Sequence, residues 1–320
     1  MLSRVADSLY WMSRYLERAE HTAQVLDVNL QRMLEQAPRH AARRWERVMK
    51  TLRLVKTKPE KLDAFTLTSE LTFNPSTRES ILACMAAARE NARQVREQIP
   101  SEMWEKINKL YLRVKSATME DVWRGESHEF LSGVREGIHL FHGITDGLMN
   151  HNEGWHFIQV GRFIERAQST AALLGAYGPD LVNAADRIAD VRDYFEWVGM
   201  LRSCMAFEAY CKVYTADLRP ERITEFLLLN AEFPRSVHFS AIMVQSALNA
   251  IAEFTGTKKA SRANRLAGRL RSMLGFSQID EILGEDLNTY LDDIQHHCAQ
   301  IHVATHQIYI SYPIESALAS

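Results

Sequence analysis

Residues 1–33 read MLSRVADSLYWMSRYLERAEHTAQVLDVNLQRM, and this opening stretch decides the fold. Apolar side chains recur along it in steps of three and four, from Leu2 to Met33. Such an a/d heptad stripe indicates one long helix that buries a single seam. Pro38 follows the stripe. Because proline lacks a backbone N–H and clashes with the preceding turn, we expect it to end the helix.

The rest of the chain repeats this periodicity. Ser76-Thr-Arg-Glu79 has the form of a capping box and predicts a helix that runs to Gln98. Ser101 is expected to cap the next helix. Further helices are predicted over residues 128–150, 153–177, 184–215, 234–254, 259–274 and 285–311. Strand signals are scarce, so the predicted fold class is all-α, an antiparallel helical bundle.

The composition is that of an ordinary globular protein. Of the 320 residues, 46% are hydrophobic and 24% are charged, and the net charge is -2. This balance gives no general attraction to nucleic acid or anionic lipid, and no stretch approaches the roughly 20 apolar residues that span a bilayer. Charges interrupt the opening residues, so no signal peptide is expected. We therefore predict a cytoplasmic protein with no nucleic-acid or membrane partner, and homo-oligomerisation stays open.

One segment of the chain occurs twice. Residues 14–23, RYLERAEHTA, align with residues 162–171, RFIERAQSTA, and six of the ten positions are identical. A weaker match aligns Phe73, Ser76 and Ser80 with Phe233, Ser236 and Ser240. We infer two helical halves related by duplication, residues 1–115 and 151–320, joined by residues 116–150.

The repeated charges carry the candidate site. If Leu16 occupies an a position, the charges of the first copy fall at b, c and f, on the face opposite the apolar seam. The candidate binding residues are Arg14, Glu17, Arg18, His21, Arg162, Glu165 and Arg166. The secondary candidates are Tyr10, Trp11, Arg89, Arg93 and Arg235.

Three interpretations of this motif stay open. A solvated face explains one copy, but each surface ion pair contributes only about 0.2–0.5 kcal/mol, which gives little reason for the same residues to recur. In the second interpretation, Glu17 pairs with Arg166, or Glu165 with Arg18, in buried contacts between the halves. In the third, the arginines line a cleft and hold a carboxylate or phosphate while the glutamates orient them.

Two E-x-x-H patterns raise the question of a metal site. Glu136-Gly-Ile-His139 and Glu153-Gly-Trp-His156 are similar to the paired motifs of di-iron bundles. They lie close together in the chain, and a glycine inside each weakens the helix that such a site needs. We therefore expect no metal and no cofactor, and we keep a metal-binding bundle as an alternative. The sequence assigns no catalytic residue.

Several stretches in combination resemble the bacterial alpha-E family. They are residues 1–23, GRFIERA at 161–167, AARENARQVRE at 87–97 and FPRSV at 233–237. The family is named for its helices and an E-R pair, which here falls on Glu17-Arg18 and Glu165-Arg166. The second copy departs from the pattern, with Gln168 where an acidic residue is common.

The resemblance implies a role rather than a reaction. Genes of the family typically sit beside those for a circularly permuted ATP-grasp amidoligase and a transglutaminase-like cysteine peptidase, so these two proteins are the implied partners. We expect a non-catalytic accessory protein of such a peptide-forming or peptide-modifying system. One alternative is an enzyme of the same pathway that uses Glu17 or Glu165 for acid–base chemistry on a peptide-like substrate. The other is the metal-binding bundle.

Overall fold

The computed structural model describes residues 1–35, 41–54, 63–124, 127–184, 191–215, 217–257 and 261–310. Within these ranges the chain forms helices and no strand, which confirms the all-α class. No described helix is long and apolar enough to cross a membrane. Pro38, expected to end the first helix, lies outside the described residues.

Seven helices lie before residue 150 among the described residues and eight after it. The first set is α1 (Ser3–Glu35), α2 (Ala41–Thr51), α3 (Ala64–Phe73), α4 (Ile81–Gln94), α5 (Ser101–Ser116), α6 (Met119–Arg124) and α7 (Ser127–Leu148). The second set is α8 (Glu153–Ala184), α9 (Val191–Ser203), α10 (Phe207–Tyr214), α11 (Pro220–Leu229), α12 (Val237–Thr255), α13 (Arg262–Phe276), α14 (Ile279–Gly284) and α15 (Leu287–Thr305).

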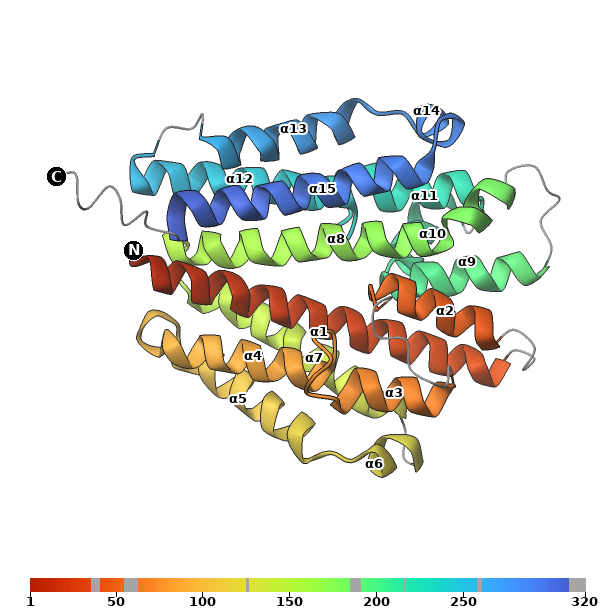
Figure 1. Ribbon diagram of the computed structural model, residues 1–320, viewed down its shortest axis with the longest axis horizontal. Coiled ribbons are helices and arrows are strands. Elements are labelled where there is room, and N and C mark those ends of the chain that lie inside the picture. Colours follow the sequence, from red (N-terminus) through yellow and green to blue (C-terminus); the bar gives the residue numbers. More distant parts are fainter. Residues whose placement is uncertain are drawn as a thin grey trace.

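Helices α1 and α8 lie side by side through the middle of the molecule (Figure 1). They run in the same direction, because the amino group of Met1 contacts Glu153 where both helices begin, and Arg18 contacts Glu165 further along. Helices α4 and α7 pack along α1, whereas α12 and α15 pack along α8. Figure 1 shows the earlier helices mainly on one side of the central pair and the later ones on the other.

The bundle is not antiparallel throughout. Within the first set, α4 runs against α1, because Ser8 bonds to Gln94 near one end and Thr22 bonds to the carbonyl of Glu79 further along. The central pair is parallel instead, because α7 carries the chain back to the end of the molecule where α1 begins. The segment 116–150, expected to join two halves, contains α7, which packs against both α1 and α5.

Helix α1 is enclosed along most of its length. Contacts with α4, α7, α8 and α9 leave no broad outer face, and Tyr10 and Glu17 are 0% and 2% exposed. The charged face opposite the apolar seam is therefore buried as well, which rules out the solvated face among the three interpretations. A heptad pattern describes burial against one neighbour, whereas α1 has several.

Two helix starts differ from the predicted ones. Ser80, rather than Ser76, caps α4, since its hydroxyl oxygen accepts the backbone N–H of Ala83. Ser101 is the first residue of α5 and provides no side-chain cap.

The predicted helix over residues 184–215 is interrupted. Helix α9 ends at Ser203, and α10 begins at Phe207. Between them Met205 has a φ of 52°, in the left-handed region, so the chain changes direction there. No glycine or proline at this point predicts the break.

The loops before α4 and α12 are built alike. Ser80 donates its hydroxyl to the carbonyl of Asn74, and Ser236 donates its hydroxyl to the carbonyl of Asn230. Ser236 also caps α12 as Ser80 caps α4. The equivalent serines are therefore Ser80 and Ser236, and the sequence match of Ser76 with Ser236 was wrong.

Candidate functional site

The two E-R motifs meet where α1 contacts α8. Gly161 lets the two backbones approach, because a Cβ at this position would overlap the carbonyl of Tyr10 and the hydroxyl of Ser13. The next turns of both helices carry the arginines and glutamates of the motifs. The close approach therefore sets these charges face to face.

Glu165 is the centre of the first cluster and is 1% exposed. Arg18 donates to its two carboxylate oxygens from Nε at 2.8 Å and from Nη2 at 3.1 Å, and Arg14 donates from Nε at 2.7 Å. Burial alone would raise the pKa of Glu165, but Arg14 and Arg18 hold that pKa below its ordinary value. The buried carboxylate therefore stays ionised.

Glu17 is the centre of the second cluster. Arg166 donates to its two oxygens from Nε at 2.5 Å and from Nη2 at 2.9 Å, and its Nη1 donates to the carbonyl of Pro234 at 3.1 Å. Nε of Arg162 and Nη1 of Arg235 each lie 3.7 Å from a Glu17 oxygen. Three guanidinium groups thus surround this carboxylate.

Each glutamate is therefore bound by the arginine of the other motif. This geometry confirms the predicted contacts Glu17–Arg166 and Glu165–Arg18. Two-point guanidinium–carboxylate pairing fixes orientation as well as distance. We call these two reciprocal pairs the E-R brace. The duplication from which the contacts were predicted stays a prediction.

Two secondary candidates, Tyr10 and Trp11, adjoin the first cluster. Arg14 donates to the Tyr10 hydroxyl at 3.2 Å, and its guanidinium carbon lies 5.0 Å from the centre of the Trp11 ring. The Tyr10 hydroxyl also lies 2.8 Å from Nδ1 of His302. Burial lowers the pKa of His302 to about 4, so this ring is neutral at neutral pH and its Nδ1 can accept a hydrogen bond from the Tyr10 hydroxyl.

Arg235 extends the second cluster to Glu20, which sequence analysis did not select. Arg235 and His139 both contact one oxygen of this fully buried carboxylate, the histidine at 2.5 Å. Burial raises the pKa of Glu20, but Arg235 and His139 bring it well below the ordinary value. The counterpart of Glu20 in the other motif is Gln168, which accepts a hydrogen bond from Arg14 at 2.9 Å. The sequence signal that could have identified Glu20 is its position three residues after the motif glutamate Glu17.

Arg89 and Arg93 lie away from the E-R brace. Arg89 donates to Asn108 at 2.7 Å and lies over two aromatic rings of α5. Arg93 pairs with Glu90 on the surface at 2.6 Å. The structure therefore does not bring these two arginines to the site predicted for them. His21 lies beside the first cluster, and its Nε2 has no hydrogen-bond partner among the described residues.

One group of side chains has the composition of a metal site. Glu17, Glu20 and His142 place one donor atom each within 4.8 Å of one another. The two carboxylates already face guanidinium groups, those of Arg162, Arg166 and Arg235. Burial and Arg162 lower the pKa of His142 well below its ordinary value, which reflects an unfavourable environment for further positive charge. The donor set therefore does not fit a divalent cation.

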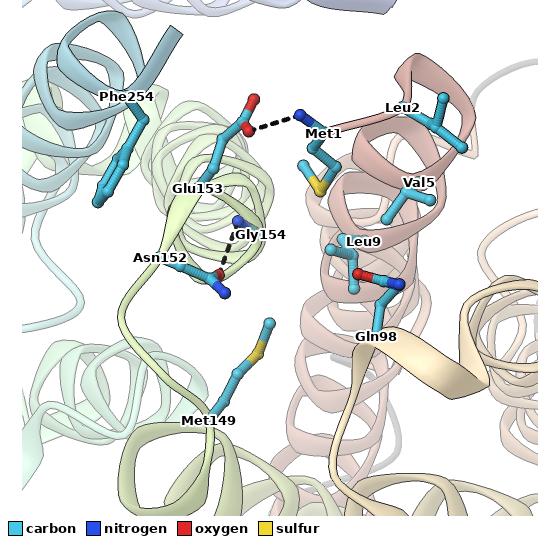
Figure 2. A pocket seen from close by; sticks show the side chains of 10 residues that line it. All are labelled: Met1, Leu2, Val5, Leu9, Gln98, Met149, Asn152, Glu153, Gly154 and Phe254. Atoms are coloured by element: carbon cyan, nitrogen blue, oxygen red, sulfur yellow. Dashed lines mark hydrogen bonds and ion pairs between the residues drawn. The ribbon is translucent and has the colours of Figure 1, made fainter.

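A pocket of about 340 Å³ lies where α1 and α8 begin (Figure 2). Its lining is largely apolar, with Leu2, Leu9 and Phe254 among its residues. The carboxylate of Glu153 binds the amino group of Met1 there at 2.9 Å (Figure 2).

The residues of the two E-x-x-H patterns lie in different parts of the molecule. Glu153 pairs with Met1 at the start of the central helices, whereas His139 contacts Glu20. The two E-x-x-H patterns do not converge on one site.

These features define an all-α protein in which two parallel central helices are joined by reciprocal glutamate–arginine pairs. The chain belongs to the Alpha-E family, described as a predicted alpha-helical domain with a conserved ER motif, which matches residues 1–310.

Curated relatives are similar in sequence but do not carry a described activity. The chain is 22% identical over 314 residues to an uncharacterized protein of Mycobacterium bovis and to one of Mycobacterium tuberculosis strain CDC 1551. It is 21% identical to an uncharacterized protein of Mycobacterium tuberculosis strain H37Rv. Each match covers 91% of this chain and 34% of the relative, so the chain spans about a third of their length. No solved structure matches it.

Proposed function

We propose that this chain is a non-catalytic partner protein in a peptide-forming or peptide-modifying system, in which the E-R brace keeps the helical body rigid for docking. The observation that carries the proposal is the commitment of Glu165 to Arg14 and Arg18 in a buried contact. A binding surface built on rigid elements holds its geometry better than one on loops.

The same observation weighs against an acid–base role for this glutamate. A general acid or base needs a pKa near the working pH and access to the substrate proton. The pKa of Glu165 is held low by its two arginines, and the side chain is 1% exposed. Glu17 is equally enclosed, at 2% exposure. These carboxylates suit structural pairing better than proton transfer.

The partners in this proposal are the ATP-grasp amidoligase and the transglutaminase-like peptidase that the family resemblance implies. A direct contact through Arg14, Glu17, Glu165 or Arg166 is disfavoured by their burial. We therefore place the contact on exposed residues around the brace and give the brace the role of holding that surface in shape.

Co-expression with the neighbouring amidoligase tests the proposal. We expect the two proteins to elute together in size-exclusion chromatography, and ligase activity to fall when this chain is omitted. Separate elution together with full ligase activity in its absence would contradict the partner role. If the purified chain alone converts a peptide-like substrate, and Glu165→Gln abolishes this without lowering stability, the enzyme alternative replaces it.

A further inference from the structure

A small polar cavity opens beside the first cluster of the E-R brace. Its volume is about 130 Å³, and it lies between α1, α8, the end of α2 and the start of α4. Its charged and titratable lining consists of Arg18, His21, Arg53, Arg78, Glu79 and Glu165. The hydroxyl-bearing residues of its lining are Thr22, Thr51 and Ser169.

Positive charge exceeds negative charge in this cavity. Glu165 is already bound by Arg14 and Arg18, so it offers little to other cations. The guanidinium groups of Arg53 and Arg78 make no hydrogen bond or ion pair with any described residue. Burial, together with Arg53, lowers the pKa of His21 to about 4, as expected beside uncompensated positive charge.

The backbone of Arg53 gives a second, independent observation. Helix α2 ends with the Arg53 N–H bonded to the carbonyl of Lys50 at 3.0 Å and the Leu54 N–H bonded to the carbonyl of Met49 at 2.9 Å. Arg53 itself has a φ of 59°. Glycine is the residue that this helix ending favours, because a side chain strains the left-handed conformation. The backbone conformation at this position therefore does not explain why the residue is an arginine, whereas a role for its side chain does.

The second cluster has a region equivalent to this cavity, in which an arginine is paired with a carboxylate of the protein itself. The hydroxyl of Thr22 donates to the carbonyl of Glu79 at 3.0 Å, and the hydroxyl of Thr170 donates to the carbonyl of Arg235 at 2.9 Å. In the second cluster, Arg235 turns inward and pairs with Glu20. The first cluster has Gln168 as the counterpart of Glu20, as described above, and so it lacks one carboxylate.

We propose that this cavity binds a small oxyanion, the carboxylate or phosphate group of a ligand, between Arg53 and Arg78 with Arg18 behind it. Guanidinium forks match both kinds of group. Pockets for drug-sized ligands measure roughly 300–1,000 Å³, so 130 Å³ suits a single anionic group rather than a whole nucleotide. The inference rests on the proposed function only in taking the ligand to be an acidic group that the partner system handles.

Calorimetric titration of the full chain with inorganic phosphate, and separately with glutarate, tests this site. Glutaramide, which has the same skeleton without charge, is the control ligand. We expect saturable binding of at least one oxyanion and no binding of glutaramide. Saturation by phosphate alone identifies a phosphate site, and saturation by glutarate alone identifies a carboxylate site. If neither phosphate nor glutarate shows saturable binding, the proposal is overturned.

Two variants at the C-terminal end of α2, one in its last turn and one just beyond it, separate the site from general electrostatics. Arg53→Gly should weaken oxyanion binding by about tenfold or more, while its melting temperature stays the same or rises because glycine suits the left-handed position. Lys50→Ala removes one positive charge from an exposed residue in the last turn of α2, outside the cavity, and should leave binding nearly unchanged. Equal weakening in the two variants contradicts a built site.

The site and the partner role fail separately in these experiments. A complex with the amidoligase that forms normally, with no oxyanion bound by the free chain, overturns the site alone. Oxyanion binding with no complex overturns the partner role alone.

Discussion

Glu17 and Glu165 are buried carboxylates, and each is bound by arginines of the neighbouring helix. Surface ion pairs contribute little to stability. A buried pair behaves differently, since removal of one partner leaves an uncompensated charge in a poorly solvated place. The residues of the E-R brace are therefore expected to respond as a group to the loss of any member.

Glu165→Gln is the first test at this scale. The substitution keeps the side-chain volume but removes the charge that Arg14 and Arg18 share, so we expect the free energy of unfolding to fall by about 3 kcal/mol or more. Glu90→Gln is the matched control, because Glu90 pairs with Arg93 on the surface. Urea denaturation of both variants measures the difference. Equal effects at the two positions would argue against a buried brace.

Acid should destabilise the protein in two steps. The pKa of His21 is lowered from 6.5 to about 4 by burial and Arg53, so the unfolded chain binds a proton first and stability falls between pH 6.5 and 4. The pKa of Glu165 is lowered from 4.5 by its arginines despite burial, so its stabilisation is complete above pH 4.5 and is lost as the pH falls further. Urea denaturation between pH 3 and 8 measures both steps, and His21→Gln should reduce the first. A constant free energy of unfolding over this range contradicts both assignments.

Helices α1 and α8 are the elements that sequence analysis predicted best. Their periodicity and the repeated motif gave their existence and the contacts Glu17–Arg166 and Glu165–Arg18. The burial of the motif was not predictable from α1 alone, because periodicity finds the strongest apolar seam and does not count neighbours. Only the packing of α4, α7 and α9 around α1 encloses the remaining faces.

Two other features, the break between α9 and α10 and the cavity at Arg53, were not predicted from the sequence. The break between α9 and α10 falls at Met205, a residue with no turn preference. The cavity at Arg53 is lined by residues of α1 and α8, of the end of α2 and of the segment before α4, so no single stretch of sequence carries its pattern.

Gly161→Ala tests the contact between the two central helices. A Cβ at this position would overlap the carbonyl of Tyr10, so we expect α1 and α8 to separate, the brace to distort and the melting temperature to fall. Gly147→Ala, in α7, is the control, because a Cβ there meets nothing within 4 Å. Alanine is favoured over glycine in a helix by about 0.5–1 kcal/mol, so the control should be neutral or stabilising. Thermal unfolding of both variants distinguishes the overlap from the general effect of the substitution.

At the scale of the whole molecule, the reciprocal pairs connect the two sets of helices at their centre. The parallel direction of α1 and α8 places both motifs at the same height, and each glutamate then faces the arginine of the other helix. Such a joint favours one relative position of the two sets, which is the property that the proposed docking role requires.

The charge around Glu17 and Glu20 leads to a prediction for the whole protein. Because Arg162, Arg166 and Arg235 already face these carboxylates, purified protein should contain iron, manganese and zinc at well below one atom per chain. Chelation should leave its melting temperature unchanged. Elemental analysis measures the first, and a stoichiometric metal whose removal lowers the melting temperature would support the metal-binding alternative.

A double-mutant cycle between Glu17 and Arg166 tests the brace most directly. The free energy of unfolding is measured for the wild type, Glu17→Gln, Arg166→Met and the double variant. We predict a coupling energy of about 1–3 kcal/mol, with the double variant less destabilised than the sum of the single ones, because residues in one ion-pair network are not additive. Additive effects, with a coupling near zero, would contradict the account.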